Sequence, residues 1–319
     1  MESLNPPMRL ALLDVARAQR ERLSALLKFP HEFASPAEAR QSVDAVIALR
    51  FGAAEAARYQ TSMLHLPGAG ADAVDMSALE PGCVVCNVFE HEIPVAEFVM
   101  TAILDHTLEY GRMHNQFDGD RWNETYAARR PHGEVHGRVL GLLGYGHIGK
   151  AVTERAHAFG MRVHVISQSG NAPEADWVGR PPQLHDMLSR VDFLVIACPL
   201  NEATRGMVGT SELLLMKPTA VLINIGRAQI IQEEPLYRAL ESKQLAGATL
   251  DVWYDYPREG TGEIKPSRFP FYKLPRVHCT AHSSGWSEEL FQRRYDVIAD
   301  NLTRRHGALP LRDVIYTAP

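Results

Sequence analysis

A glycine-rich turn between an apolar strand and a helix constrains this chain more than any other feature of its sequence. Residues 139–143 (VLGLL) are apolar, and Gly144-Tyr-Gly-His-Ile-Gly149 follows them directly. Gly144 permits a tight turn, Gly146 lets the backbone approach a pyrophosphate, and Gly149 lets the helix and the strand pack closely. The helix that begins here offers free N–H groups to phosphate oxygens. This segment is therefore predicted to bind a nicotinamide dinucleotide.

Length and charge narrow the class of protein. The 319 residues suggest about two domains. The net charge of −5, from 33 basic and 38 acidic residues, argues against nucleic acid as the main partner. No run of about 18 or more apolar residues occurs, and the N-terminus lacks a basic region followed by an apolar core. We therefore expect no membrane partner and a cytoplasmic location.

Two of the four cysteines, Cys83 and Cys86, form a C-x-x-C pair. A zinc site usually needs a second pair of ligands, and none is visible nearby. The surrounding residues read as a buried strand. We therefore expect inert thiols and no metal site.

Alternating apolar strands and helical stretches predict an α/β fold with two doubly wound parallel-sheet domains. The helical pattern of residues 94–113 begins with Pro94, a favourable first helical residue, and is expected to cross between the domains. Residues 114–136 are polar and are expected to form an extended connection. We expect a Rossmann dinucleotide-binding domain over residues 94–285. It would be inserted in a smaller, flavodoxin-like substrate domain formed by residues 1–93 and 286–319.

The strand after the glycine turn ends in Ser167-Gln168-Ser169, without the carboxylate that usually binds the adenosine ribose. Without that charge, nothing repels a 2′-phosphate, and Arg180 lies within reach along the chain. The cofactor is therefore expected to be NAD or NADP, with a slight preference for NADP.

Six motifs in the right order resemble those of the D-isomer-specific 2-hydroxyacid dehydrogenases, in particular the glyoxylate/hydroxypyruvate reductase-like members. The resemblance extends roughly from residue 45 to residue 303. The motifs are Gly68-Ala-Gly-Ala-Asp-Ala-Val-Asp75, Pro94-Val-Ala-Glu-Phe98, Cys198-Pro-Leu-Asn-Glu-Ala-Thr204, Leu222-Ile-Asn-Ile-Gly-Arg227, Gly247-Ala-Thr-Leu-Asp-Val252 and Thr280-Ala-His-Ser-Ser-Gly285.

The resemblance implies an NAD(P)-dependent oxidoreductase that interconverts a 2-oxo acid and a D-2-hydroxy acid. Arg227 would bind the substrate carboxylate and polarise the carbonyl, since a guanidinium can donate to both. His282 would be the acid/base, because imidazole titrates near neutrality. The backbone N–H groups of Ala69 and Gly70 would bind the carboxylate, and His91 and Trp286 would line the substrate pocket.

The glycine turn and the resemblance together define an expected set of cofactor-binding residues. These are Gly144, Gly146, His147, Ile148, Gly149, Ser167, Gln168, Cys198, Pro199, Thr204, Ile225, Asp251, His282 and Ser284.

The sequence departs from the family at one catalytic position. Most members have a glutamate five residues after the aspartate that corresponds to Asp251, where it pairs with the histidine. Here that position is Tyr256, which carries no fixed negative charge at neutral pH. Asp255 is one residue too early. We therefore predict a His282 that is less basic than usual and is partnered by Tyr256 or by no residue.

Two other functions remain open at this point. One is an NAD(H)-binding sensor or corepressor-like protein with little catalysis, which the missing glutamate favours. The other is a formate- or phosphite-type dehydrogenase, which the aromatic residues expected around the pocket disfavour. By analogy with the family, we expect a homodimer.

Overall fold

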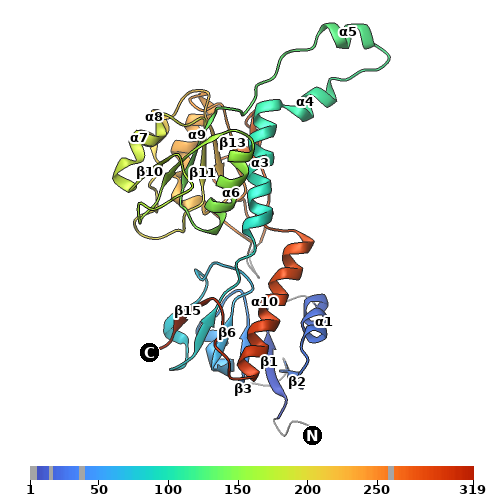
Figure 1. Cartoon of the computed structure of the whole chain (residues 1–319), viewed down its shortest axis with the longest axis vertical. Helices are drawn as coiled ribbons and strands as arrows, with labels where there is room; N and C mark the ends of the chain where they lie inside the picture. Colours follow the sequence, from blue (N-terminus) through green and yellow to red (C-terminus); the bar gives the residue numbers. More distant parts are fainter. Residues whose placement is uncertain (1–5, 14–16, 36–39, 258–261) are drawn as a thin grey trace. The chain divides into compact units, whose positions relative to one another are not determined.

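The computed structural model describes residues 6–13, 17–35, 40–257 and 262–319. The chain forms two compact units, Met1–His91 with Ser287–Pro319, and Glu92–Trp286 (Figure 1). Each unit is built on a largely parallel sheet with helices, as the alternating sequence pattern predicts. The expected α/β fold class is therefore confirmed.

The first unit contains a six-stranded sheet in which only β15 is antiparallel to its neighbour, β7. In sheet order the strands are β15 (Val314–Thr317), β7 (Val84–Cys86), β6 (Met63–His65), β4 (Ala45–Ile47), β1 (Met8–Leu12) and β2 (His31–Phe33). A short parallel pair, β3 (Gln41–Val43) with β5 (Tyr59–Thr61), accompanies it.

Strand periodicity divides the core of the first unit between the two faces of the sheet. Leu10 and Ile47 pack on one face with residues of α1 (Arg17–Leu26) and α10 (Glu288–His306). Ala11 and Val46 point to the other face, where Tyr59 and Phe51 complete a second cluster beside α2 (Ala53–Arg58). The sheet is thus buried on both faces, as a parallel sheet requires.

The second unit contains a seven-stranded, wholly parallel sheet. In sheet order the strands are β10 (Trp177–Gly179), β9 (Arg162–Ile166), β8 (Val139–Leu143), β11 (Phe193–Ile196), β12 (Val221–Asn224), β13 (Gly247–Leu250) and β14 (Val277–Cys279). The chain runs outward in opposite directions from β8 and β11. Such a reversal of strand order is where ligands bind in open α/β sheets.

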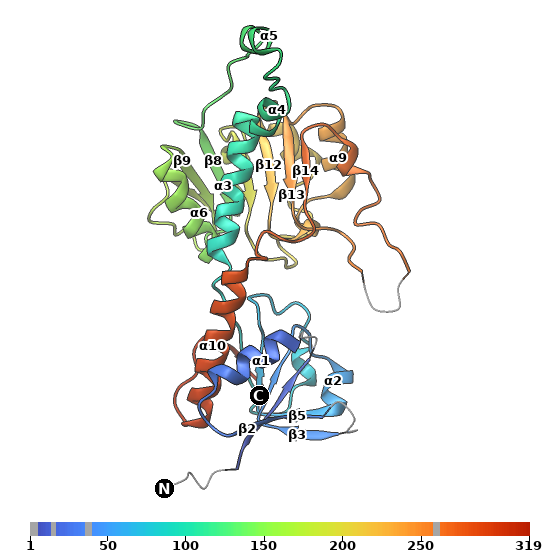
Figure 2. The same ribbon diagram turned by 90° about the vertical axis from the view of Figure 1, so that its right-hand side faces the viewer.

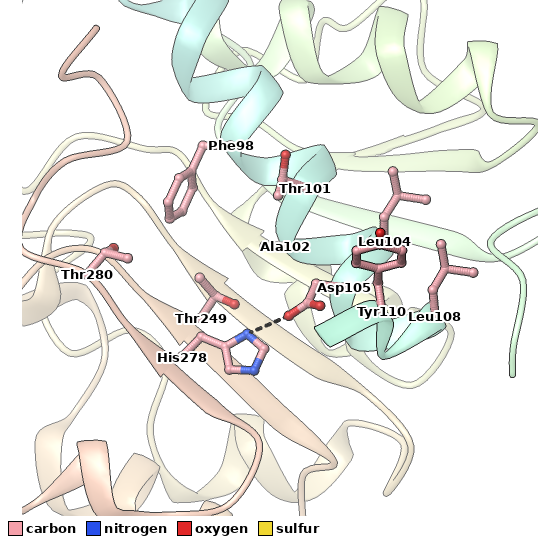
Figure 3. Close-up of a pocket in the computed structure, with 10 residues that line it drawn as sticks. All are labelled: Phe98, Thr101, Ala102, Leu104, Asp105, Leu108, Tyr110, Thr249, His278 and Thr280. Carbon is pink, nitrogen blue, oxygen red and sulfur yellow. Dashed lines mark ion pairs between the residues drawn. The ribbon is translucent and has the colours of Figure 1, made fainter. Parts of the chain in front are cut away.

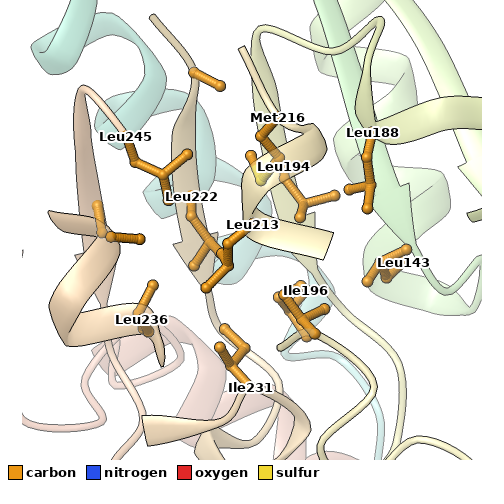
Figure 4. Packing of buried hydrophobic residues seen from close by; sticks show 14 of the residues in the cluster. Leu143, Leu188, Leu194, Ile196, Leu213, Met216, Leu222, Ile231, Leu236 and Leu245 are labelled. Carbon is orange, nitrogen blue, oxygen red and sulfur yellow. The ribbon is translucent and has the colours of Figure 1, made fainter. Parts of the chain in front are cut away.

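Helices cover both faces of this sheet (Figure 2). The helices are α3 (Glu92–Leu108), α6 (His147–Ala158), α7 (Leu184–Leu188), α8 (Thr210–Leu215) and α9 (Glu233–Glu241). Leu142 and Val195 face α3 and α6, whereas Leu143 and Leu194 face the other three helices. Figure 4 shows the second of these clusters, where leucine and isoleucine side chains of strands and helices meet.

The prediction of one helix over residues 94–113 is wrong in one respect, because the helix is broken at Glu109. This residue has a left-handed φ of 54°, and α4 (Tyr110–Asn115) begins after it. The Arg276 guanidinium donates to the carbonyl oxygen of His106 at 3.0 Å and to the Glu109 carboxylate at 2.5 Å. It therefore takes the carbonyl that the next helical turn would need.

The connection expected to be extended contains a further helix, α5 (Trp122–Ala127). Within their unit, α4 and α5 lie on an arm that leads away from the sheet (Figure 1, Figure 2). The side chains of Tyr110, Phe117, Trp122 and Tyr126 on this arm are more than half exposed.

Both thiols of the C-x-x-C pair are free and buried, in and beside β7. Burial raises the pKa of the Cys86 thiol to about 12. A thiol with so little thiolate is unreactive, which agrees with the expected structural role.

Candidate active site

The expected cofactor and catalytic residues of the second unit lie along one edge of its sheet. All strands are parallel, so the residue that follows each strand lies at the same carboxyl-terminal edge. In sheet order these residues are Ser167 and Gln168 after β9, Gly144 after β8, Cys198 after β11, Ile225 and Arg227 after β12, Asp251 after β13, and His282 and Ser284 after β14.

The glycine turn has the geometry that a dinucleotide requires. Gly144 has a left-handed φ of 103°, and a Cβ there would lie 2.8 Å from the backbone of Cys198. A Cβ on Gly149 would lie 2.6 Å from the carbonyl oxygen of Gly144. Gly146, by contrast, is the N-cap of α6 and faces open space, with nothing within 4 Å of an added Cβ. The residues present therefore fit a pyrophosphate at this helix terminus, next to His147 and Ile148.

The segment that directly follows β9, Ser167-Gln168-Ser169, contains no carboxylate, and Arg180, after β10, lies beside it. The Arg180 guanidinium donates to the carbonyl oxygen of Ser169 at 3.0 Å and lies against Gly170, whose φ is 67°. Ser167 is buried, and its N–H donates to Gly179. A cation thus lies beside the segment in which dinucleotide domains usually place an acid.

The segment after β11 is closed by side-chain hydrogen bonds. The Thr204 hydroxyl donates to the carbonyl oxygen of Pro199 at 2.7 Å and accepts the N–H of Asn201 at 2.9 Å. The Asn201 side chain in turn accepts the N–H of Thr204. The expected residues Pro199 and Thr204 therefore shape this loop, while the thiol of Cys198 stays protonated because burial raises its pKa to about 11.

Arg227 follows β12 and is held by a residue that the sequence did not single out. Asn224 ends the apolar strand and is 2% exposed. Its amide donates to the carbonyl oxygen of Arg227 at 3.1 Å, and its Oδ1 accepts the N–H of Gly226 at 3.1 Å. An amide at the end of an otherwise apolar strand, two residues before Gly226-Arg227, was the available signal for this role.

His282 lies next to Tyr256, as predicted. Nδ1 of His282 is 2.9 Å from the Tyr256 hydroxyl, which also accepts the backbone N–H of Trp253 at 3.1 Å. Burial lowers the pKa of His282. The positive charge of Arg227 lowers it further, and the negative charge of Asp251 opposes both effects. A tyrosine hydroxyl therefore lies at Nδ1, where the resemblance to the dehydrogenase family implies a glutamate.

Asp251 organises the loop that carries His282. Its buried carboxylate accepts three hydrogen bonds, from the Thr280 hydroxyl at 2.6 Å and from the N–H groups of Ser283 and Ser284 at 2.7 and 3.0 Å. His282, within this loop, has a left-handed φ of 55°. The carboxylate thus stabilises a backbone conformation that a histidine rarely adopts.

The expected substrate residues Ala69, Gly70 and His91 belong to the first unit. They follow β6 and β7, neighbouring parallel strands, so they lie at the carboxyl-terminal edge of that sheet. Asn87 donates to the carbonyl oxygen of Ala69 at 2.9 Å and ties the two loops together. Trp286, at the end of the second unit, is 71% exposed.

A parallel sheet with a glycine turn at its strand-order reversal, and with an arginine and a histidine at the same edge, defines a dinucleotide-binding protein of the dehydrogenase class. The family model for the NAD-binding domain of D-isomer specific 2-hydroxyacid dehydrogenases matches residues 100–284. The chain belongs to this family.

Curated relatives are reductases and dehydrogenases of the same family. The glyoxylate reductase of Thermococcus gammatolerans is 42% identical over 126 residues, 39% of this chain and 37% of that protein. The glyoxylate/hydroxypyruvate reductase B of Yersinia enterocolitica is 32% identical over 214 residues, 65% of this chain and 62% of that protein. The chain thus spans between about a third and two thirds of the length of these relatives.

Solved structures match over nearly the whole chain. The 2-hydroxyacid dehydrogenase of Ketogulonicigenium vulgare is 25% identical and covers 99% of this chain and 100% of its own, with a TM-score of 0.79. The NADPH-dependent glyoxylate/hydroxypyruvate reductase of Sinorhizobium meliloti, solved with NADP and sulfate, is 22% identical. It covers 97% of this chain and 98% of its own, with a TM-score of 0.77. Because the Sinorhizobium meliloti reductase is only 22% identical, its likeness to this chain supports the fold alone.

Among the described residues, no helix is both long and apolar enough to cross a membrane.

Proposed function

We propose that this protein is an NAD(P)-dependent oxidoreductase that interconverts a 2-oxo acid and a D-2-hydroxy acid. One observation carries the proposal: Arg227 follows β12 and His282 follows β14, the strands on either side of β13, so both lie at the carboxyl-terminal edge of the dinucleotide-type sheet. Named relatives that reduce glyoxylate and hydroxypyruvate support it. They do not favour the sensor or the formate/phosphite alternative.

In the proposed reaction, the bound nicotinamide supplies or accepts the hydride at C2 of the substrate. Arg227 binds the carboxylate and polarises the carbonyl, because a guanidinium donates in two parallel directions. His282 gives a proton to the carbonyl oxygen during reduction and takes it back during oxidation. Backbone N–H groups of Ala69 and Gly70 bind the carboxylate, and His91 and Trp286 contact the substrate side chain, which favours a bulky or apolar acid over glyoxylate.

The cofactor is proposed to lie along the carboxyl-terminal edge, from the loop after β9 to the loop after β14. The open space at Gly146 accommodates the pyrophosphate. A preference for NADP is supported by Arg180, whose guanidinium binds the carbonyl oxygen of Ser169 in a segment, residues 167–169, that contains no carboxylate. An Arg180→Ala variant should then bind NADPH about 10- to 100-fold more weakly while its affinity for NADH changes little, as expected for the loss of a charge-assisted hydrogen bond. Arg162→Ala, at the opposite end of β9, is the matched control.

A cytoplasmic homodimer is proposed as the working form. All four cysteines are free thiols, which persist in reducing compartments. The arm of residues 109–136 exposes aromatic side chains, and a pocket of about 390 Å³ opens beside α3 in the same unit (Figure 3). Phe98, Leu104, Leu108 and Tyr110 make the pocket largely apolar. Aromatic residues and an apolar pocket on one unit suit association of two copies.

The test is an assay of reduced-nicotinamide consumption with NADH and NADPH against a panel of 2-oxo acids that ranges from glyoxylate to bulky apolar acids. Turnover of at least one acid, and its loss in His282→Asn and Arg227→Ala variants that still bind cofactor, is the expected result. Cofactor binding without turnover of any acid would contradict the proposal. Activity confined to glyoxylate would contradict the proposed preference for bulky or apolar acids.

A further inference from the structure

The hydroxyl of Tyr256 can do what a glutamate cannot. A carboxylate only accepts hydrogen bonds, and its charge stabilises an imidazolium. A tyrosine hydroxyl carries one donor and two acceptor positions and no charge at neutral pH. Here one acceptor position takes the N–H of Trp253. The hydroxyl oxygen lies 2.9 Å from Nδ1 of His282, so either its hydrogen or its remaining lone pair can pair with that nitrogen.

We propose that Tyr256 is a positioning residue whose hydroxyl pairs with His282 in both of its protonation states, donating to a bare Nδ1 and accepting from a protonated Nδ1. The proposal rests on the acid/base role of His282 in the proposed function. In the imidazolium, and in the neutral tautomer with hydrogen on Nδ1, Tyr256 accepts. In the neutral tautomer with hydrogen on Nε2, it donates.

The two charged groups near the ring have opposite effects on the pKa of His282. Asp251, at the end of β13, raises its pKa, and Arg227, after β12, lowers it. Tyr256, in the loop after β13, adds no charge. Partial desolvation of the ring lowers the pKa below the ordinary value, so neutral imidazole predominates at pH 7.

The consequence for catalysis follows from the proton balance. In reduction, C2 of the 2-oxo acid gains a hydride and its carbonyl oxygen gains the Nε2 proton, so an imidazolium becomes a neutral ring with hydrogen on Nδ1. Oxidation runs the same step backwards and needs Nε2 without hydrogen. The tautomer in which Tyr256 donates has hydrogen on Nε2 and can neither give nor take the proton. Only the imidazolium can give the Nε2 proton, so the rate of reduction falls about tenfold per pH unit above the pKa of His282.

The decisive experiment compares the pH profiles of kcat/KM for 2-oxo acid reduction in the wild type, Tyr256→Glu, Tyr256→Gln and Tyr256→Phe. The wild type should lose activity above a break below pH 6.5, the ordinary imidazole value. Tyr256→Glu should move the break upward by about one unit or more, since a carboxylate favours the imidazolium. Tyr256→Gln, which also donates and accepts, should keep the low break and stay within about tenfold of the wild-type rate.

Tyr256→Phe should keep the low break but lose about tenfold or more in rate, because nothing then orients the ring. Tyr272→Phe, an exposed hydroxyl removed elsewhere, should leave both the rate and the break unchanged. Equal rates in the Gln and Phe variants would overturn the proposal, because a purely structural aromatic side chain predicts the Phe variant to be the better one.

An NMR titration of the His282 ring separates this proposal from the proposed function, because it needs no turnover. The resonance is assigned with His282→Asn. A pKa below 6.5 in the wild type and a higher one in Tyr256→Glu support the proposal, and equal values contradict it. If the titration behaves as expected while no 2-oxo acid is turned over, the hydrogen-bond pairing stands and the proposed function fails.

Discussion

At the scale of single residues, the candidate site depends on buried polar groups that hold one protonation state or one backbone conformation. Asp251 accepts three hydrogen bonds from the loop of His282, and Asn224 fixes the backbone of Arg227. Burial makes these bonds worth more than they would be in water, because an unpaired polar group in the interior pays its full desolvation cost.

Replacing Asp251 by asparagine tests this arrangement. One amide oxygen cannot accept from Thr280, Ser283 and Ser284 as two carboxylate oxygens do, so we expect a loss of about 1–3 kcal/mol in the free energy of unfolding. The negative charge that raises the pKa of His282 also disappears, so that pKa should fall further. Chemical denaturation and the pH profile of reduction measure the two effects. Asp255→Asn, an exposed neighbour, should change neither.

His65 provides a second prediction at this scale, about stability in acid. The side chain is fully buried in β6, and burial lowers its pKa to about 4. Asn301 donates to its Nε2 at 2.9 Å, so a protonated ring would lose this bond. The unfolded chain binds a proton near pH 6.5 whereas the folded chain does so only near pH 4. The free energy of unfolding should therefore fall as the pH is lowered from 6.5 to about 4, by up to about 1.4 kcal/mol per pH unit.

Urea denaturation at a series of pH values checks this slope. His65→Gln keeps a polar side chain but removes the titration, so its unfolding free energy should depend less steeply on pH over the same interval. An equal slope in both proteins would show that His65 does not contribute. His106, whose pKa is lowered to about 3, adds a similar dependence in the second unit.

At the scale of elements, substitutions in the glycine turn between β8 and α6 distinguish effects on folding from effects on cofactor binding. Gly144→Ala should cost about 1–2 kcal/mol for the left-handed φ alone, and more because its Cβ would meet the backbone of Cys198. Gly146→Ala should cost less, about 0.5–1 kcal/mol, because its φ is negative and the space is open, although alanine is a poorer N-cap than glycine.

The same Gly146→Ala change should weaken NAD(P)H binding by about tenfold or more, since the added methyl group fills the space proposed for the pyrophosphate. Thermal denaturation and fluorescence titration of the cofactor give the two readouts. If Gly146→Ala binds cofactor as tightly as the wild type, the pyrophosphate does not lie there.

Element prediction succeeded where the local pattern was strong and failed where distant residues intervened. The strands β8, β11, β12 and β13 and the helix α10 could be predicted, because apolar runs and helical periodicity are local. The break at Glu109 could not, because Arg276 lies 167 positions away in sequence. The strand β15 was missed for a similar reason. Its residues are mostly exposed, and only pairing with β7 makes it a strand.

At the scale of the whole molecule, the proposed dimer gives the clearest test. Light scattering of the purified protein should give twice the chain mass of 35.5 kDa. A Trp122→Asp, Tyr126→Asp double variant should shift the mass toward the monomer, because charges on exposed aromatic positions oppose an apolar contact. Leu214→Asp, an equally exposed apolar position on α8, should leave the mass unchanged. A monomeric wild type would contradict the dimer.

Short local patterns predict the dinucleotide turn and the residues that end the strands, and the family resemblance points to Tyr256 in place of a glutamate. Tertiary structure decided which of these residues meet. Asp251, Tyr256 and His282 come together because β13 and β14 are neighbours in the sheet, and Arg227 joins them from β12. Strand order is a property of long-range packing, so the hydrogen bond between Tyr256 and His282 could be anticipated from spacing but only the fold brings its two atoms to 2.9 Å.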